Sequence, residues 1–338
     1  MLIETVEMHT GGEPLRIITS GYPEIIGDTI LEKRRYVREH LDHLRRLLMF
    51  EPRGHYDQYG ALLVKPDHPE ADIAVIFMHN EGYSTMCGHA VIALGRFAID
   101  YGYKKIPVDS KHQPSHSVNI QCPCGLVRTE VKMQNRKPMT VKFLSVPSFA
   151  FATDITINTC KYGPLTLDIG YGGAFYALVS QDKLGVDVET SPVRDLVDAA
   201  DAISTCVKEQ VKILHPEEED LSFLYGTIIT DGKDNFSDEP TSNLCVFADR
   251  QVDRCPTGSG VTARIAVQFA KNLIPLRAER TFKNGPVKST FTGQAFEETT
   301  CGELKAVRVQ VCGVAFYTGK CSFTFEEDDP LRDGFLVK

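Results

Sequence analysis

The chain contains an internal repeat, and a repeat with a long period predicts a fold built from two related modules. Residues 86–93 read MCGHAVIA and residues 256–263 read PTGSGVTA. With Cys87 aligned on Thr257, both segments continue with a glycine and share a valine and an alanine at equal spacing. Each pattern is typical of a loop that opens a helix, so the two segments are expected at equivalent places in the two modules.

A second pair of motifs supports the repeat over the alternative of chance similarity. A Gly-Gly pair at residues 11–12 precedes Cys87, and another at 172–173 precedes Thr257. The separations are 75 residues in the first case (87 − 12) and 84 in the second (257 − 173). The stretch 145–149, which contains a proline and two serines, is the predicted linker between the modules.

Short apolar runs typical of β-strands are frequent, whereas helical patterns are few. The predicted helices cover residues 29–48, 88–101, 192–209 and 258–272. The predicted strands are 15–19, 61–64, 73–77, 118–120, 140–143, 165–169, 175–179, 225–230, 244–247, 306–311 and 322–325. Many strands joined by short turns, without regular alternation of strand and helix, predict the α+β class.

Charge and cysteine content narrow the possible functions. The formal net charge of −8 argues against a nucleic-acid surface, which needs a basic patch. The one basic stretch, residues 31–50, has helical apolar spacing and is predicted to be a solvated helix face, not a polyanion site. No apolar run reaches the roughly 20 residues of a membrane helix, and residues 1–20 are too acidic for a secretory signal. The ten cysteines are therefore expected to be reduced thiols of a cytoplasmic protein.

Cys87 is the first candidate for catalysis. It stands directly before Gly88 at a predicted helix start, where a thiolate is favoured and the backbone can approach a ligand. The thiolate could remove a proton from carbon, or it could act as a nucleophile with His89 or His79 as its base. The alternative is an inert buried cysteine, which is a common role for this residue.

Thr257 limits what the thiol can do. Two cysteines facing each other could move a proton across a carbon centre in both directions, which is racemisation. A threonine hydroxyl is too weakly acidic to replace the second thiol. A carbanion formed by one thiol must then resolve in another way, for example by expelling a β-substituent, so the pair predicts elimination. The alternative is that Thr257 only caps the helix.

Asp253 lies four residues before Thr257 and could hold a substrate ammonium or merely favour the helix N-terminus. Cys255 lies ahead of Pro256, outside the aligned position, and is not expected to be catalytic. The sequence contains no glycine-rich dinucleotide or phosphate loop and no His-Glu-x-x-His motif. A reaction without cofactor or metal is therefore expected.

Five motifs, in order, resemble the proline racemase family, whose relatives include diaminopimelate epimerase. They are MHTGGEP at 8–14, NEGYS at 80–84, MCGHA at 86–90, YGGAFYA at 171–177 and DRCPTGSG at 253–260, and the similarity continues to DDPL at 328–331. Racemases of the family carry cysteine where this chain has Thr257. The chain is therefore most similar to the branch that dehydrates trans-3-hydroxy-L-proline to Δ1-pyrroline-2-carboxylate.

The resemblance implies a fold and an assembly. Each of two pseudo-symmetric α/β modules would be a mostly antiparallel sheet wrapped around a central helix, with the ligand in the cleft between modules. The first module, residues 1–147 completed by 319–338, would carry Cys87, and the second, 148–318, would carry Thr257. The family also leads us to expect a homodimer.

The resemblance further implies roles for single residues. Cys87 would take the Cα proton of the hydroxyproline, and Asp253 would pair with the ring ammonium. Thr257 or His89 could assist loss of the C3 hydroxyl, and the sequence leaves this choice open. The substrate carboxylate would be bound by the backbone amides of Gly88, His89, Gly258 and Ser259.

Two other functions remain open at this level. The first is a proline or 4-hydroxyproline racemase or epimerase, against which Thr257 argues unless Cys255 reaches the site. The second is a protein that binds an amino acid without turning it over. Cys87 argues against the second function, because a binding protein needs no thiol.

Overall fold

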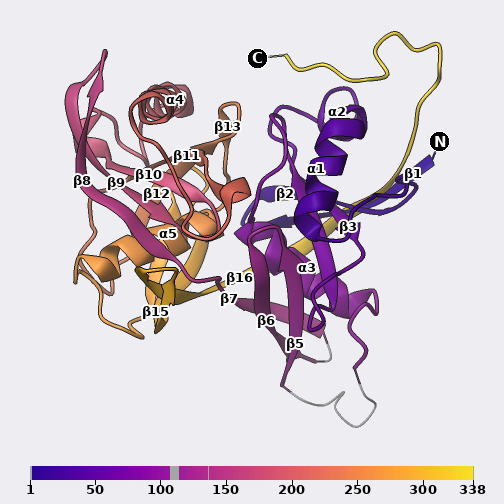
Figure 1. Ribbon diagram of the computed structural model, residues 1–338, viewed down its shortest axis with the longest axis horizontal. Helices are drawn as coiled ribbons and strands as arrows, with labels where there is room; N and C mark the ends of the chain where they lie inside the picture. Colours follow the sequence, from indigo (N-terminus) through magenta and orange to yellow (C-terminus); the bar gives the residue numbers. More distant parts are fainter. Residues whose placement is uncertain (1, 107–113, 136, 338) are drawn as a thin grey trace. The chain divides into compact units, whose positions relative to one another are not determined.

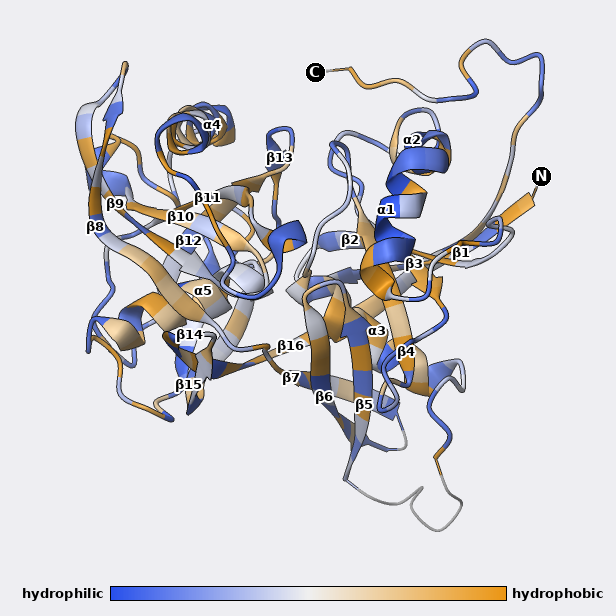
Figure 2. Cartoon of the chain, in the orientation of Figure 1, coloured by the Kyte–Doolittle hydropathy of each residue, from blue (hydrophilic) through white to orange (hydrophobic). Residues whose placement is uncertain are grey.

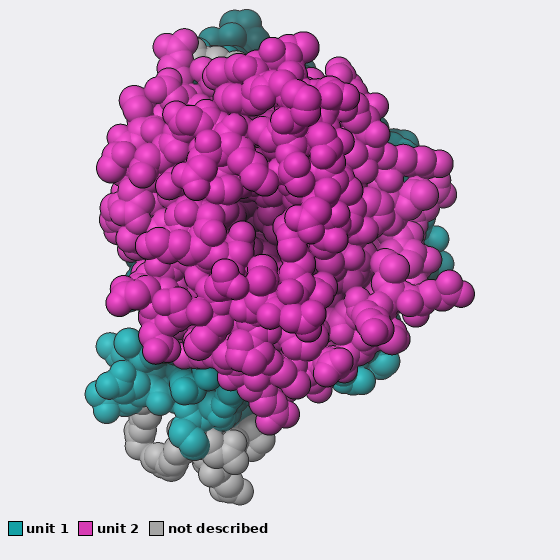
Figure 3. Space-filling view, turned by 90° about the vertical axis from the view of Figure 1, so that its left-hand side faces the viewer, with its two compact units in different colours: residues 1–85, 89–142, 314–338 teal, residues 86–88, 143–313 magenta. Residues whose placement is uncertain are grey.

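The computed structural model describes residues 2–106, 114–135 and 137–337, and the chain divides into two compact units (Figures 1 and 3). Unit 1 comprises residues 1–85, 89–142 and 314–338, and unit 2 comprises 86–88 and 143–313. The two units therefore meet along the chain between residues 142 and 143 and between residues 313 and 314. Residues 86–88, which include Cys87, group with unit 2, whereas the sequence analysis assigned them to the first module.

Unit 1 is built on strands in the order β1-β2-β3-β4-β5-β6-β7. Strand β1 also pairs with the C-terminal half of β16. The elements that begin in this part of the chain are β1 (Leu2–Thr10), β2 (Glu13–Ser20), α1 (Ile30–His40), α2 (Asp42–Met49), β3 (Gly60–Val64), β4 (Ile73–Met78), α3 (Gly88–Asp100), β5 (Ser115–Cys122), β6 (Gly125–Gln134) and β7 (Lys137–Leu144).

Unit 2 has strands in the order β16-β15-β14-β12-β11-β10-β9-β8, with the short β13 paired to β12. Its elements are β8 (Phe149–Thr159), β9 (Gly163–Tyr171), β10 (Phe175–Ser180), η2 (Gln181–Lys183), α4 (Val193–Gln210), η3 (Glu219–Leu221), β11 (Leu224–Thr230), β12 (Thr241–Phe247), β13 (Gln251–Val252), α5 (Gly258–Ala270), β14 (Arg280–Asn284), β15 (Thr290–Cys301) and β16 (Leu304–Thr324).

The two units repeat one topology, which confirms the predicted duplication and the α+β class. The hairpins β1–β2 and β9–β10 are antiparallel, and each turns at one of the Gly-Gly pairs. A parallel pair follows in each unit, β2–β3 across α1 and α2, and β10–β11 across α4. After an antiparallel strand comes a second parallel pair, β4–β5 across α3 and β12–β14 across α5.

The helices that follow Cys87 and Thr257 are both mostly buried. Helix α5 contacts β8, β9, β10 and β15, strands from both ends of the unit 2 order, so the sheet curves around it (Figure 1). Eleven consecutive residues of α5, from Gly258 to Gln268, are buried. Helix α3 is buried from Gly88 to Gly95, and the lack of a side chain at Gly95 lets it pack against Val141 and Thr129.

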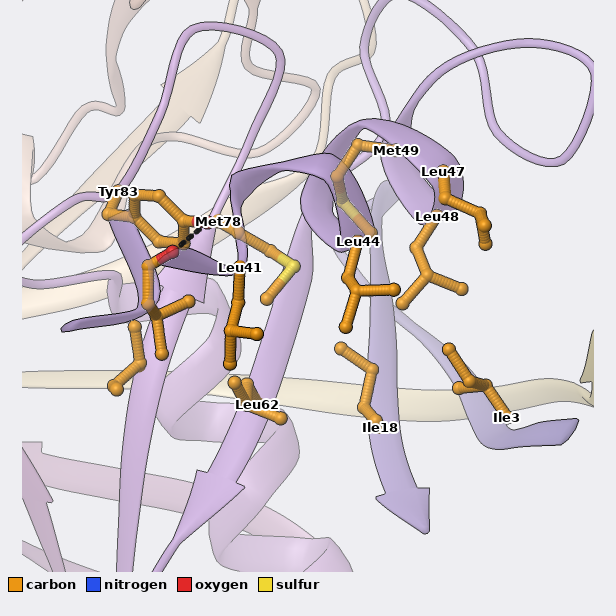
Figure 4. Close-up of a cluster of buried hydrophobic side chains, with 12 residues drawn as sticks. Ile3, Ile18, Leu41, Leu44, Leu47, Leu48, Met49, Leu62, Met78 and Tyr83 are labelled. Atoms are coloured by element: carbon orange, nitrogen blue, oxygen red, sulfur yellow. Dashed lines mark hydrogen bonds between the residues drawn. The ribbon is translucent and has the colours of Figure 1, made fainter. Parts of the chain in front are cut away.

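A second core of unit 1 lies under α1 and α2 (Figure 4). Leu44 and Leu48 of α2 and Val37 of α1 belong to one buried cluster with Ile18 and Leu62 of the strands. Strand β4, with the sequence IAVIFM, contributes Ile76 and Met78 to this core and is mostly apolar (Figure 2). The predicted single helix over 29–48 is two helices, because the chain leaves helical geometry at Leu41 (φ −123°, ψ 13°).

No helix of the described residues is long and apolar enough to span a membrane.

Candidate active site

Thr257 adopts an unusual conformation at the start of α5. Its φ is +68° and its ψ is 90°, a left-handed region that β-branched residues rarely occupy and that costs about 1–3 kcal/mol. Its side chain makes no capping hydrogen bond. The hydroxyl Oγ1 is buried. A buried hydroxyl that does not cap the helix, on a residue in a strained conformation, argues against the capping alternative and points to a role at a ligand.

The segment that carries Cys87 touches this helix start inside unit 2. A Cβ atom built on Gly88 would lie 2.5 Å from Cα of Gly258, and one built on Gly258 would lie 2.7 Å from Cα of Gly88. Only glycine permits such an approach of two backbones. Cys87 and Thr257 immediately precede these glycines, so the segment with the thiol and the segment with the hydroxyl lie in one region of unit 2.

We expect Gly258→Ala to lower activity at least about 100-fold without unfolding the protein, because an added methyl group must push the Gly88 segment away from α5. Steady-state kinetics together with thermal unfolding would measure this effect. The matched control is Gly319→Ala, since Gly319 has ordinary φ and open space around its Cβ position. Equal activity of the two variants would show that the close contact has no role in the site.

The loop before Thr257 is held by side chains from two neighbouring strands. The Asn284 amide donates to the carbonyls of Asp253 (2.8 Å) and Cys255 (3.0 Å), and the Asn243 amide donates to that of Pro256 (3.1 Å). Both asparagines are buried. The sequence analysis missed these residues, because each lies in an ordinary strand pattern with no local signal of its function.

Cys255 contributes to the same loop and is fully buried. Its sulfur accepts the backbone N–H of Thr257 at 3.3 Å, and its own backbone N–H donates to the Asp253 carboxylate at 2.8 Å. These contacts give Cys255 a role in shaping the turn before Thr257.

Asp253 is buried, and its burial raises the pKa of its carboxyl above the ordinary value. Several contacts oppose this increase in pKa without cancelling it. They are hydrogen bonds from the thiol and the amide of Cys255, a hydrogen bond from the Thr257 hydroxyl, and the positive charge of Arg254. A buried carboxylate without a full counter-charge favours binding of a cation. Asp253 therefore remains the candidate for an ammonium site.

The two histidines considered as bases are buried in unit 1 and remain neutral. Burial lowers the pKa of both His79 and His89 to about 3. Nδ1 of His79 faces the backbone N–H groups of Glu81 and Gly82, each at 3.3 Å, so it stabilises a turn. The ring of His89 packs edge-on against Tyr59, with 4.9 Å between centroids.

The basic stretch of residues 31–50 has a structural role that the sequence analysis did not foresee. Arg34 is buried and donates to the carbonyl of Tyr83 at 2.6 Å. Arg45, also buried, donates to the carbonyls of His79 (2.7 Å) and Asn80 (2.8 Å). These guanidinium groups fix the loop that leads to Cys87, so the prediction of a solvated face is wrong for them. The helical spacing of residues 31–50 does not reveal whether an arginine faces solvent or a buried carbonyl group, because the carbonyl groups belong to a distant part of the sequence.

The family model for proline racemase matches residues 5–336. A trans-L-3-hydroxyproline dehydratase from Xenopus tropicalis is 60% identical over 337 residues, covering 100% of this chain and 96% of the relative. A trans-3-hydroxy-L-proline dehydratase from Homo sapiens is 57% identical over 338 residues, covering 100% of this chain and 95% of the relative.

A solved structure has the same fold over almost the whole length. The crystal structure of a hydroxyproline epimerase from Agrobacterium vitis, with bound trans-4-hydroxy-L-proline, superimposes with a TM-score of 0.92 at 25% identity. The match covers 99% of this chain and 95% of the epimerase chain. With the family model and the relatives matched from end to end, the chain belongs to the proline racemase family.

Proposed function

We propose that this chain is a hydro-lyase that converts trans-3-hydroxy-L-proline to Δ1-pyrroline-2-carboxylate and water without a cofactor. The observation that carries the proposal is the asymmetry of the site, in which Thr257 stands where the second thiol of a racemase would be. Its strained backbone and its buried hydroxyl, which does not cap the helix, support a role at a ligand. The dehydratases that are 57% and 60% identical to this chain support the substrate.

The carboxylate of the substrate would bind at the start of α5. The first hydrogen bond of this helix runs from Val261 N–H to Thr257 O (2.7 Å), so the amides of Gly258 and Ser259 have no acceptor within the helix. Such amides favour an anion, and they favour the enediolate formed on loss of the Cα proton more strongly. We propose that the backbone amides of Gly88 and His89 also bind the substrate carboxylate.

Asp253 would pair with the ring ammonium, and this role sets the effect of Asp253→Asn. A neutral amide cannot replace the charge, so we expect KM to rise at least about 100-fold. The same variant should weaken substrate binding but increase the stability of the free protein. Because the folded-state pKa is raised, the contribution of Asp253 to stability is complete below its unfolded pKa of about 4 and is lost as pH rises through the folded pKa.

The asparagine variant should therefore melt at a higher temperature than the wild type near pH 8, and the two should converge near pH 4. Thermal unfolding at both pH values and steady-state kinetics measure the two effects. An unchanged KM contradicts the ammonium role, and a lower melting temperature near pH 8 contradicts the buried charge.

The stereochemistry of the substrate identifies the source of the proton for the leaving group. In the trans isomer the C3 hydroxyl and the carboxylate lie on opposite faces of the ring, so the hydroxyl and the Cα hydrogen share a face. The Cys87 thiolate takes the Cα proton, and the Cα–H electrons form the Cα–C3 double bond as the C3–O bond breaks. The new thiol then lies on the face from which the hydroxyl leaves.

We therefore propose that Cys87 returns its proton to the departing hydroxyl, which forms water and regenerates the thiolate. His89 is unsuited to this task, because burial lowers its pKa to about 3 and leaves no imidazolium at neutral pH. Thr257 would contact the ring without exchanging a proton. The enamine product tautomerises to Δ1-pyrroline-2-carboxylate.

Incubation of the purified protein with trans-3-hydroxy-L-proline tests the proposed function, with Δ1-pyrroline-2-carboxylate followed by NMR. The cis isomer is the control, because its hydroxyl and Cα hydrogen lie on opposite faces. We expect product from the trans isomer alone. Product from both isomers at similar rates would contradict proton return by Cys87, and no product from either would contradict the dehydratase.

We extend the proposal to cell compartment and assembly. Ten cysteines in a sequence without the pattern of a disulfide framework support a reducing compartment such as the cytoplasm. A homodimer and a division into duplicated modules near residues 147 and 318 follow from the family pattern. Light scattering of the purified chain would measure the assembly.

A further inference from the structure

Tyr176 is a buried tyrosine that the mechanism above does not use. It lies on β10, three residues after the Gly-Gly pair, and its side chain is completely buried. Its hydroxyl lies 2.7 Å from Oγ of Ser259, the second residue of α5. The thiols of Cys87 and Cys245 are close enough to act electrostatically on the phenol. Tyr176 therefore lies directly behind the proposed carboxylate site, within unit 2.

The chemistry of the two hydroxyls indicates which one donates. Burial raises the pKa of Tyr176 well above 10, so the phenol keeps its proton at neutral pH. A phenol is a stronger acid than an alkyl alcohol and is the better donor, whereas the serine oxygen is the better acceptor. The hydrogen bond thus runs from Tyr176 to Ser259.

The direction of this hydrogen bond determines where the hydroxyl hydrogen of Ser259 can point. An oxygen that accepts from Tyr176 must turn its own O–H elsewhere. Ser259 lies in the first turn of α5, beside the amides of Gly258 and Gly260, which have no acceptor within the helix. Its hydroxyl is therefore available to a ligand that binds there.

We propose that Tyr176 is a positioning residue that orients the Ser259 hydroxyl as an additional hydrogen-bond donor to the substrate carboxylate. The inference rests on the proposed function and adds to it two groups, a phenol and a side-chain hydroxyl. A donor aimed in advance at an oxygen is most effective where negative charge increases, so its main contribution is to the enediolate.

A double-mutant cycle of Tyr176→Phe and Ser259→Ala tests the inference. We expect Ser259→Ala to lower kcat about 100-fold and Tyr176→Phe to lower it about 10-fold, with KM changed less than kcat in both. Tyr176→Phe should have no further effect once Ser259 is alanine, because the phenol acts through the serine. A residue that only stabilised the fold would give multiplicative losses instead, and these would overturn the inference.

The control variant is Tyr171→Phe. Tyr171 is another buried tyrosine of unit 2, and it stacks on Phe149 with 5.0 Å between ring centroids. Its activity should stay within about twofold of the wild type, as for a substitution away from the site. If Tyr176→Phe fails to fold, Ser259→Ala decides alone, and a loss smaller than twofold overturns the inference.

Calorimetric binding of L-proline separates this inference from the proposed function, since it measures carboxylate binding without turnover. We expect both single variants to weaken binding about threefold, and the double variant to be no weaker than Ser259→Ala. Such coupling in a protein that does not dehydrate trans-3-hydroxy-L-proline would contradict only the dehydratase. Dehydration with independent losses for the two variants would contradict only the role of Tyr176.

Discussion

We expect Cys87→Ala to abolish dehydration, with a loss in kcat of about 10,000-fold or more, because in the proposed mechanism one side chain both removes the Cα proton and protonates the leaving hydroxyl. Cys87→Ser should lose nearly as much, since a serine hydroxyl is too weakly acidic to form the required anion at neutral pH. Product formation from trans-3-hydroxy-L-proline over long incubation measures both losses.

Cys87→Ala removes a single sulfur atom from a buried residue, so the cavity is small and the fold should stay intact. Thermal unfolding and calorimetric binding of L-proline serve as controls for each variant. Retained L-proline binding with no turnover is the expected combination. Substantial dehydration by Cys87→Ala would contradict the mechanism, even if the product were still Δ1-pyrroline-2-carboxylate.

Thr257→Cys places a second thiol at the aligned position of the repeat, and we expect it to change the kind of reaction. A thiol on the second face can deliver a proton to the carbanion, so inversion of L-proline should become measurable. Dehydration should decrease about 10- to 100-fold, because the carbanion then has a second outcome and the hydroxyl of Thr257 is lost. Polarimetry of L-proline and product formation from hydroxyproline measure the two activities.

Two further variants at this position separate the effect of the Thr257 hydroxyl from the effect of the branched side-chain shape. Thr257→Val keeps the branched side chain without the hydroxyl, and Thr257→Ser keeps the hydroxyl without the methyl group. Neither should invert L-proline. Dehydration by Thr257→Cys at the wild-type rate would mean that Thr257 has no part in the chemistry.

The central elements of the fold could be predicted because they are apolar and periodic. The helices after Cys87 and Thr257 were placed within about two residues of α3 and α5. The strands that the analysis missed include β1, β8 and β15. Strand β15, TFTGQAFEETTC, buries few of its residues, so its apolar alternation is too weak to be detected.

The site could be predicted only in part. The matched segments predict Cys87, Thr257 and the glycine that follows each of them, since these residues form local motifs. Two asparagines hold the turn before Thr257, and two arginines hold the approach to Cys87. These contacts span 13 to 49 residues of sequence, from Asn243–Pro256 to Arg34–Tyr83. Such contacts depend on tertiary structure, and the left-handed φ of Thr257 is equally invisible in the sequence.

The measurement that tests the asymmetry of the site most directly is incubation of the wild-type protein with L-proline in D2O, with trans-3-hydroxy-L-proline in a parallel sample. Chiral chromatography and mass spectrometry would follow the configuration and the deuterium content of the proline. We predict Δ1-pyrroline-2-carboxylate from the hydroxyproline and no D-proline, with any deuterium that enters Cα held in L-proline. Formation of deuterated D-proline would show a second acid–base group in the site and would contradict the single-thiol account.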